Sequence, residues 1–131
     1  FESIYEPLAY DAVRNGAELI AISTNDSWFN DSSAVYEHNS HSVLRAVENG
    51  RYIVRAANTG ISSVISPSGE IKDMLPPLVE GQISCDVTFS DKRTLYSEAG
   101  NIIVPFSVFV LAASSVIIRM KGKRSNDGHC C

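Results

Sequence analysis

The fold is decided by residues 17–57, where two short apolar segments, Ala17–Ser23 (AELIAIS) and Tyr52–Ala57 (YIVRAA), flank an amphipathic one, Val35–Gly50. A short apolar run bounded by polar residues predicts a buried β-strand. The middle segment has apolar residues at helical spacing and ends at Asn49-Gly50, which predicts a helix. Mixed strands and amphipathic helices indicate a layered α/β domain.

Elements on both sides of this stretch extend the pattern. Tyr5–Asn15 has helical spacing, and Gly16 is a natural helix end. After Asn58-Thr59-Gly60, where Gly60 is expected to have a positive φ, three more strands are predicted. These strands are Ile61–Ser66, Glu70–Met74 after the turn Pro67-Ser68-Gly69, and Val79–Val87, followed by a polar connector over Thr88–Asn101.

The predicted helix Val35–Gly50 has two kinds of face. Val43, Leu44 and Val47 share one face, whereas Arg45 and Glu48 lie elsewhere. Charged side chains are seldom buried without a partner, so we expect Arg45, Glu48 and Arg55 to form buried ion pairs.

Charge divides the chain into two parts. Residues 1–101 contain 7 Lys/Arg and 14 Asp/Glu, whereas residues 102–131 contain 4 Lys/Arg and 1 Asp. The acidic body argues against a nucleic-acid partner, because phosphate binding needs a basic face.

Residues Ile102–Ile118 (IIVPFSVFVLAASSVII) carry no charge. They predict a single transmembrane helix over residues 99–119, followed by a basic tail over 120–131. The Lys/Arg cluster after the run places the tail in the cytoplasm and the body on the other side. The alternative is a buried core helix or a pair of buried strands.

Cysteine and histidine offer little evidence for a metal or cofactor. Cys85 lies in an apolar/polar alternation and is expected to be a buried thiol. His129 with Cys130 and Cys131 gives too few ligands for a metal site. His38 and its neighbour three residues later have no evident third ligand, so we expect neither a metal nor a cofactor.

Four blocks occur in order along the chain: Phe1-Glu2-Ser3-Ile4-Tyr5, Ser23–Phe29 (STNDSWF), Arg45–Arg51 (RAVENGR) and Arg55–Gly60 (RAANTG). Together they resemble the second half of a carbon–nitrogen hydrolase domain of the nitrilase superfamily. With the apolar run and the Thr94-Leu95-Tyr96 block added, the whole chain resembles the apolipoprotein N-acyltransferase family of that superfamily.

That resemblance implies that residues 1–98 are the C-terminal half of an αββα sandwich. It also implies a multi-pass enzyme of the bacterial inner membrane, with its catalytic domain in the periplasm. The substrates would be a phospholipid acyl donor and the N-terminal amine of an apolipoprotein, joined through a Cys thioester. None of the family's Glu, Lys and Cys triad is present, so the chain is expected to be an inactive fragment.

The supporting residues near the nucleophile are also implied by the resemblance. The catalytic Cys is expected just before Phe1, whose backbone N–H would donate to an oxyanion. Glu2 matches a family acid beside the nucleophile and would orient the Lys or the incoming amine. A solvated acid at a helix start is the alternative for Glu2. Asn25 matches the start of a loop that lines the pocket.

Trp28, Phe29 and His38 complete the candidate site. The two aromatic side chains would contact acyl chains or the membrane surface. Trp28 could instead anchor the loop in the core, and His38 could be a structural hydrogen-bonding residue.

Two other functions stay open. A nitrilase-type amidase acting on a small C–N substrate fits the four blocks nearly as well, although it has no use for an apolar span. A non-catalytic membrane-tethered module is the third possibility.

Overall fold

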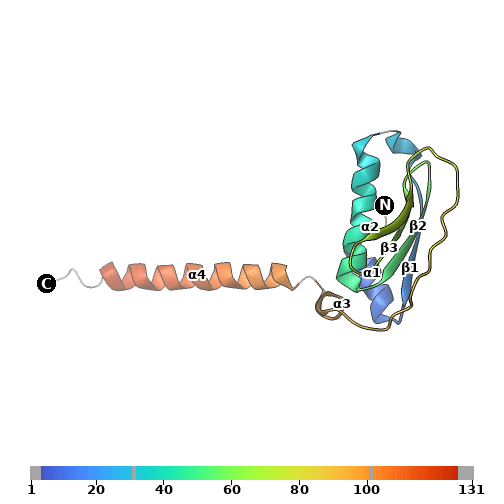
Figure 1. Ribbon diagram of the computed structural model, residues 1–131. Helices are drawn as coiled ribbons and strands as arrows, with labels where there is room; N and C mark the ends of the chain where they lie inside the picture. The colour runs from blue at the N-terminus through green and yellow to red at the C-terminus, as the bar shows by residue number, and fades with distance from the viewer. Residues whose placement is uncertain (1–3, 31, 101, 127–131) are drawn as a thin grey trace. The chain divides into compact units, whose positions relative to one another are not determined.

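The computed structural model describes residues 4–30, 32–100 and 102–126 and divides the chain into two units, Phe1–Gly100 and Asn101–Cys131. The first unit combines helices with one sheet, which confirms the α/β class. Its elements are α1 (Glu6–Arg14), β1 (Leu19–Asn25), the 3₁₀ turn η2 (Ser27–Phe29), α2 (Ser33–Asn49), β2 (Tyr52–Asn58), β3 (Ser62–Ile65), β4 (Ile71–Leu75) and α3 (Leu95–Ala99), of which Figure 1 labels all but η2 and β4. The second unit contains helix α4 (Ile103–Asn126).

The four strands form one sheet in the order β1-β2-β3-β4. β1 and β2 are parallel, with Leu19 opposite Tyr52 and Asn25 opposite Asn58. β2 pairs antiparallel with β3, and β3 pairs antiparallel with β4. The carboxyl ends of β1 and β2 therefore lie side by side, and β1 forms one edge of this sheet.

Helix α2 covers the sheet over β2 and β3. The core consists of Ala46, Ile53 and Ile65. The three apolar residues on one face of α2 differ in burial, since Val43 packs partly buried against the core, whereas Leu44 is 52% exposed and Val47 is 48% exposed. The buried side of α2 carries Val35 and Ala46 together with five polar residues, His38, Asn39, Ser42, Arg45 and Asn49. Two of these bind the sheet, since Ser42 accepts from Arg55 of β2 and Asn39 accepts from Ser63 of β3. Arg45 and Asn49 have their partners on helices.

Glycine is needed at positions 50 and 60 for two different reasons, backbone conformation and space. Gly50 ends α2 in the left-handed region with φ 62°, as a helix-terminating glycine should. The expected positive φ at Gly60 is wrong, because Thr59 takes that conformation instead, with φ 62°. Gly60 is needed for space, since a Cβ there would lie 2.1 Å from the Asp26 Oδ2 atom.

The predicted strand Val79–Val87 is also wrong, since this segment has neither helix nor strand. Its alternate side chains Ile83, Cys85 and Val87 are half-buried, so the alternation reflects contact with the domain without strand pairing. Cys85 is thus half-buried rather than buried.

The predicted polar connector contains the short helix α3, which a capping box between Thr94 and Ser97 stabilises. The Thr94 hydroxyl donates to the Glu48 carbonyl oxygen, and the Tyr96 hydroxyl donates to Glu6 Oε2 at 2.8 Å. These bonds attach α3 to α2 and α1.

The apolar run adopts one continuous helix, α4, so it does not form two strands. Several apolar side chains of α4 are exposed, for example Phe109 at 70%. Among the helices of the described residues, none is both long and apolar enough to cross a membrane. The transmembrane helix over 99–119 therefore stays a prediction.

Candidate functional site

The candidate site lies where β1 and β2 end. In open α/β sheets ligands bind outside the carboxyl ends of parallel strands. Two amide side chains meet there, as Asn58 Nδ2 donates to Asn25 Oδ1 at 3.3 Å. The backbone N–H of Ser27 donates to the same oxygen at 3.2 Å. Both amide side chains are solvent-accessible and available to a ligand.

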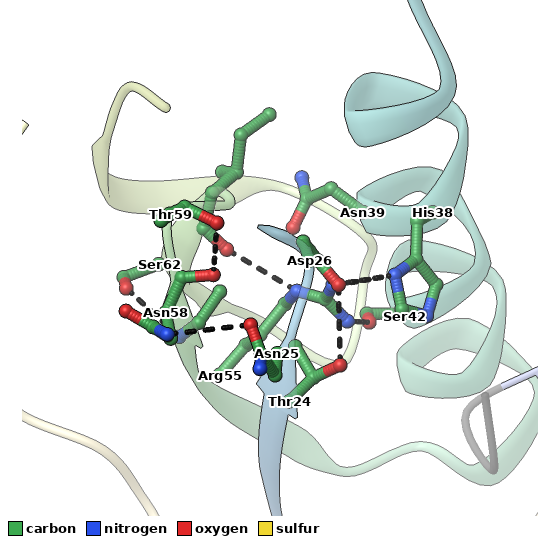
Figure 2. Close-up of polar contacts among 12 residues, drawn as sticks. Thr24, Asn25, Asp26, His38, Asn39, Ser42, Arg55, Asn58, Thr59 and Ser62 are labelled. Atoms are coloured by element: carbon green, nitrogen blue, oxygen red, sulfur yellow. Dashed lines mark hydrogen bonds and ion pairs between the residues drawn. The ribbon is translucent and has the colours of Figure 1, made fainter. Parts of the chain in front are cut away.

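Next to this amide pair, and buried from solvent, is a polar network centred on Asp26 (Figure 2). Arg55 Nη2 donates to Asp26 Oδ2 at 2.8 Å, and both side chains are 0% exposed. Asp26 Oδ1 lies 2.9 Å from His38 Nδ1 and accepts from Thr24 Oγ1 at 3.2 Å. The carboxylate thus contacts β1, β2 and α2 together.

Arg55 has further partners on two other elements. Its Nη1 donates to Ser42 Oγ at 3.2 Å and its Nε donates to the Ile61 carbonyl oxygen at 3.2 Å. Burial lowers the pKa of Arg55, and the nearby Asp26 carboxylate opposes that shift. A buried ion pair needs such additional hydrogen bonds to offset its desolvation.

His38 lies in this network beside both members of the Asp26–Arg55 ion pair. Burial lowers its pKa, as does the Arg55 charge, while Asp26 acts in the opposite direction. The ring nitrogen Nδ1 also lies 3.0 Å from Arg55 Nη2. The Phe29 ring packs edge-on to the imidazole, with centroids 5.9 Å apart.

The aromatic residues of turn η2 lie in different surroundings. Trp28 is 72% exposed, so it is not a core anchor, and its Nε1 donates to the Asn25 carbonyl oxygen at 3.0 Å. Phe29 is half-buried against His38, and its backbone N–H donates to the Asp26 carbonyl oxygen at 3.0 Å.

Trp28 and Asn25 also border a cleft of about 470 Å³ that follows β1 beneath α1. Among the described residues, apolar side chains supply most of its lining, including Leu8 from α1 and Ile22 from β1, and Arg45 adds a positive charge. A cleft of this size falls in the range that holds small-molecule ligands, about 300–1,000 Å³.

The ion pairs expected from the sequence are present, although one partner differs. Arg45 Nε lies 3.0 Å from Glu48 Oε2, and its Nη2 lies 3.9 Å from Glu6 Oε1. Burial raises the pKa of Glu48. Arg55 pairs with Asp26, a residue that the sequence analysis missed because it lies among other loop-forming polar residues.

Other sequence predictions concern residues that lie outside the described part of the chain. Phe1 and Glu2 are among them, as are His129, Cys130 and Cys131. Their proposed roles stay predictions. Within the described residues, no group of three or more His, Cys, Asp or Glu side chains has a geometry that would hold a metal ion.

Comparison with known proteins defines the class. Residues 1–96 match the carbon-nitrogen hydrolase family, and the chain belongs to that family. It is similar to the apolipoprotein N-acyltransferase of Geobacter metallireducens, with 37% identity over 129 residues, covering 98% of this chain and 24% of that protein. The corresponding Thermotoga maritima enzyme is 35% identical over 128 residues, covering 98% of this chain and 25% of that protein.

A third bacterial relative, apolipoprotein N-acyltransferase 1 of Treponema denticola, is 33% identical over 129 residues, covering 95% of this chain and 24% of that protein. The chain thus spans about a quarter of the length of the curated relatives it matches.

Proposed function

We propose that this chain is part of a membrane acyltransferase that moves an acyl chain from a phospholipid to the N-terminal amine of apolipoproteins. The observation that carries the proposal is the extent of similarity to apolipoprotein N-acyltransferases, which covers 98% of the chain. Similarity of that extent includes α4 as well as the carbon-nitrogen hydrolase body. A soluble amidase would have no need of that apolar helix.

The reaction has two steps. A Cys thiolate, which we place directly before Phe1, attacks the ester carbonyl of the phospholipid and forms a thioester, and the lysophospholipid alkoxide leaves with a proton from the protonated general base. The free amine of the apolipoprotein then attacks the thioester and expels the thiolate, and the general base accepts the amine proton. The Phe1 N–H donates to the oxyanion, and the Glu2 carboxylate orients the amine.

The described residues would supply the wall of the substrate site. The apolar cleft along β1 has the chemistry to accept an acyl chain, and Trp28 stands at its border. The exposed amides of Asn25 and Asn58 are suited to hydrogen bonding with the polar part of a substrate.

We place the protein in the bacterial inner membrane, with the first unit in the periplasm and the C-terminus in the cytoplasm. Support for α4 as the span comes from its exposed apolar side chains and from the absence of charge over Ile102–Ile118. The Lys/Arg cluster after Ile118 supports the orientation.

A chimera tests the proposal. The chain replaces the matched 129-residue segment of the Geobacter metallireducens relative. The purified chimera is assayed in detergent for transfer of a labelled acyl chain from phosphatidylethanolamine to a diacylated lipopeptide with a free N-terminal amine. We expect transfer, a loss with Glu2→Gln, and no loss with the control Lys72→Met on the exposed strand β4.

Two outcomes would contradict this proposal. Hydrolysis of small amides without acyl transfer would support the amidase, and absence of both reactions in a folded chimera would favour a non-catalytic module. The chain by itself is expected to be inactive, so an acyl thioester on Cys85 would contradict the assignment of the nucleophile.

A further inference from the structure

We infer that Asp26 is a positioning residue, whose buried carboxylate fixes Asn25 and turn η2 at the substrate edge of the sheet. Its effect on substrate binding rests on the proposed function. The positioning itself rests on geometry alone.

Asp26 connects every element that meets at this edge. Its backbone N–H donates to the Asn58 carbonyl oxygen at 3.0 Å, at the end of β2. Its own carbonyl oxygen accepts from the Phe29 N–H at 3.0 Å, which closes η2. Its carboxylate binds Arg55 of β2 and lies 2.9 Å from the His38 imidazole of α2. Backbone and side chain together hold the start of the turn.

Trp28 depends on this arrangement because its indole is mostly exposed and little packing holds it. Its Nε1 donates to the Asn25 carbonyl oxygen, and Asn25 Oδ1 accepts from the Ser27 N–H. Asn25, the residue directly before Asp26, accepts both of these hydrogen bonds. If Asp26 moves, Asn25 and Trp28 move with it, and both border the cleft.

Position 26 needs both the short length of Asp and its negative charge. A Cβ at position 60 would lie 2.1 Å from Asp26 Oδ2, so the β2–β3 turn closes directly against the carboxylate. A longer Glu side chain would not fit there. Asn would fit, but it would leave the buried Arg55 guanidinium without its counter-charge.

The single tryptophan of the sequence makes Trp28 a specific probe of the turn. We compare the full chain in detergent with Asp26→Asn, with Asp26→Asn/Arg55→Gln and with the control Asp73→Asn. The double variant leaves no buried charge unpaired, so it tests the carboxylate if Asp26→Asn fails to fold. We expect lower Trp28 fluorescence anisotropy in both Asp26 variants and no change in the control.

The same substitutions in the chimera provide a second readout. We expect the KM for the phospholipid to rise while kcat changes less, because Asp26 positions the substrate edge without contacting the reacting atoms. Unchanged anisotropy in the double variant would overturn the inference. Lower thermal stability with unchanged anisotropy and KM would show a purely structural role and overturn it as well. An inactive chimera counts against the proposed function. The anisotropy of the chain itself still tests whether Asp26 positions turn η2.

Discussion

Replacing Arg55 with Met should be among the most damaging substitutions in the body of the protein. Arg55 and Asp26 are both 0% exposed, so Arg55→Met leaves a buried carboxylate without its counter-charge. Breaking a buried pair in this way costs about 3–5 kcal/mol. The hydrogen bonds to Ser42 and to the Ile61 carbonyl oxygen are also lost. The free energy of unfolding of a typical domain is only about 5–15 kcal/mol.

The loss of stability in Arg55→Met should depend on pH, because Arg55 affects the protonation of His38. In the unsubstituted protein burial and Arg55 lower the pKa of His38, so the unfolded chain binds the proton first as pH falls. Its stability therefore decreases as pH drops below about 6.5, the ordinary pKa of histidine. In Arg55→Met the Arg55 charge is gone and Asp26 remains, so the pKa of His38 rises. A protonated His38 can then pair with Asp26.

Urea unfolding of the full chain in mild detergent, followed by far-UV circular dichroism, measures the effect. We expect Arg55→Met to lose about 3–5 kcal/mol at about pH 8 and less at about pH 5.5. Adding His38→Gln should abolish that difference. The reasoning is refuted if Arg55→Met loses less than about 1 kcal/mol, or if the loss is as large at the lower pH.

Three further predictions test other contacts. Gly60→Ala should lower stability by about 1–3 kcal/mol, because its Cβ would overlap Asp26, and thermal denaturation measures this. Trp28→Ala should change stability by less than about 0.5 kcal/mol, since the side chain is exposed, yet weaken flotation with phospholipid vesicles. Tyr96→Phe should cost about 0.5–1.5 kcal/mol by chemical denaturation, through loss of its bond to Glu6. Burial and that bond raise the pKa of Tyr96 to about 12, so the unsubstituted protein should lose stability as pH rises from about 10 to 12.

The sequence predicts most helices and strands of this fold because their signals are local. The helix stop at Gly50 and the apolar runs of β1 and β2 can be recognised from neighbouring residues alone. Strand pairing and burial cannot be recognised in this way, because they depend on residues that are distant in the sequence. Residues Val79–Val87 have the alternation of a strand without strand pairing, and Leu44 lies with apolar neighbours yet faces solvent.

The candidate site likewise contains residues with a local sequence signal and a residue whose role depends on a distant partner. Asn25 and Trp28 could be selected from the recognisable block Ser23–Phe29, and both border the cleft along β1. His38, a candidate from outside the four blocks, contacts Asp26 next to them. Asp26 escaped notice because its partner Arg55 lies 29 residues away. In a segment rich in Asn, Asp and Ser, no local feature distinguishes Asp26 as a buried carboxylate.

The position of β1 at the edge of the sheet has a practical consequence for work on this chain. Within the described residues, no strand pairs with the side of β1 that faces away from β2. Backbone N–H and C=O groups on that side, next to an apolar cleft, form a template on which a strand from another molecule can add. Self-association should therefore begin at β1 as well as at the apolar helix. Detergent that shields α4 will not prevent it, so a soluble preparation needs a charged residue or a covering strand at this edge.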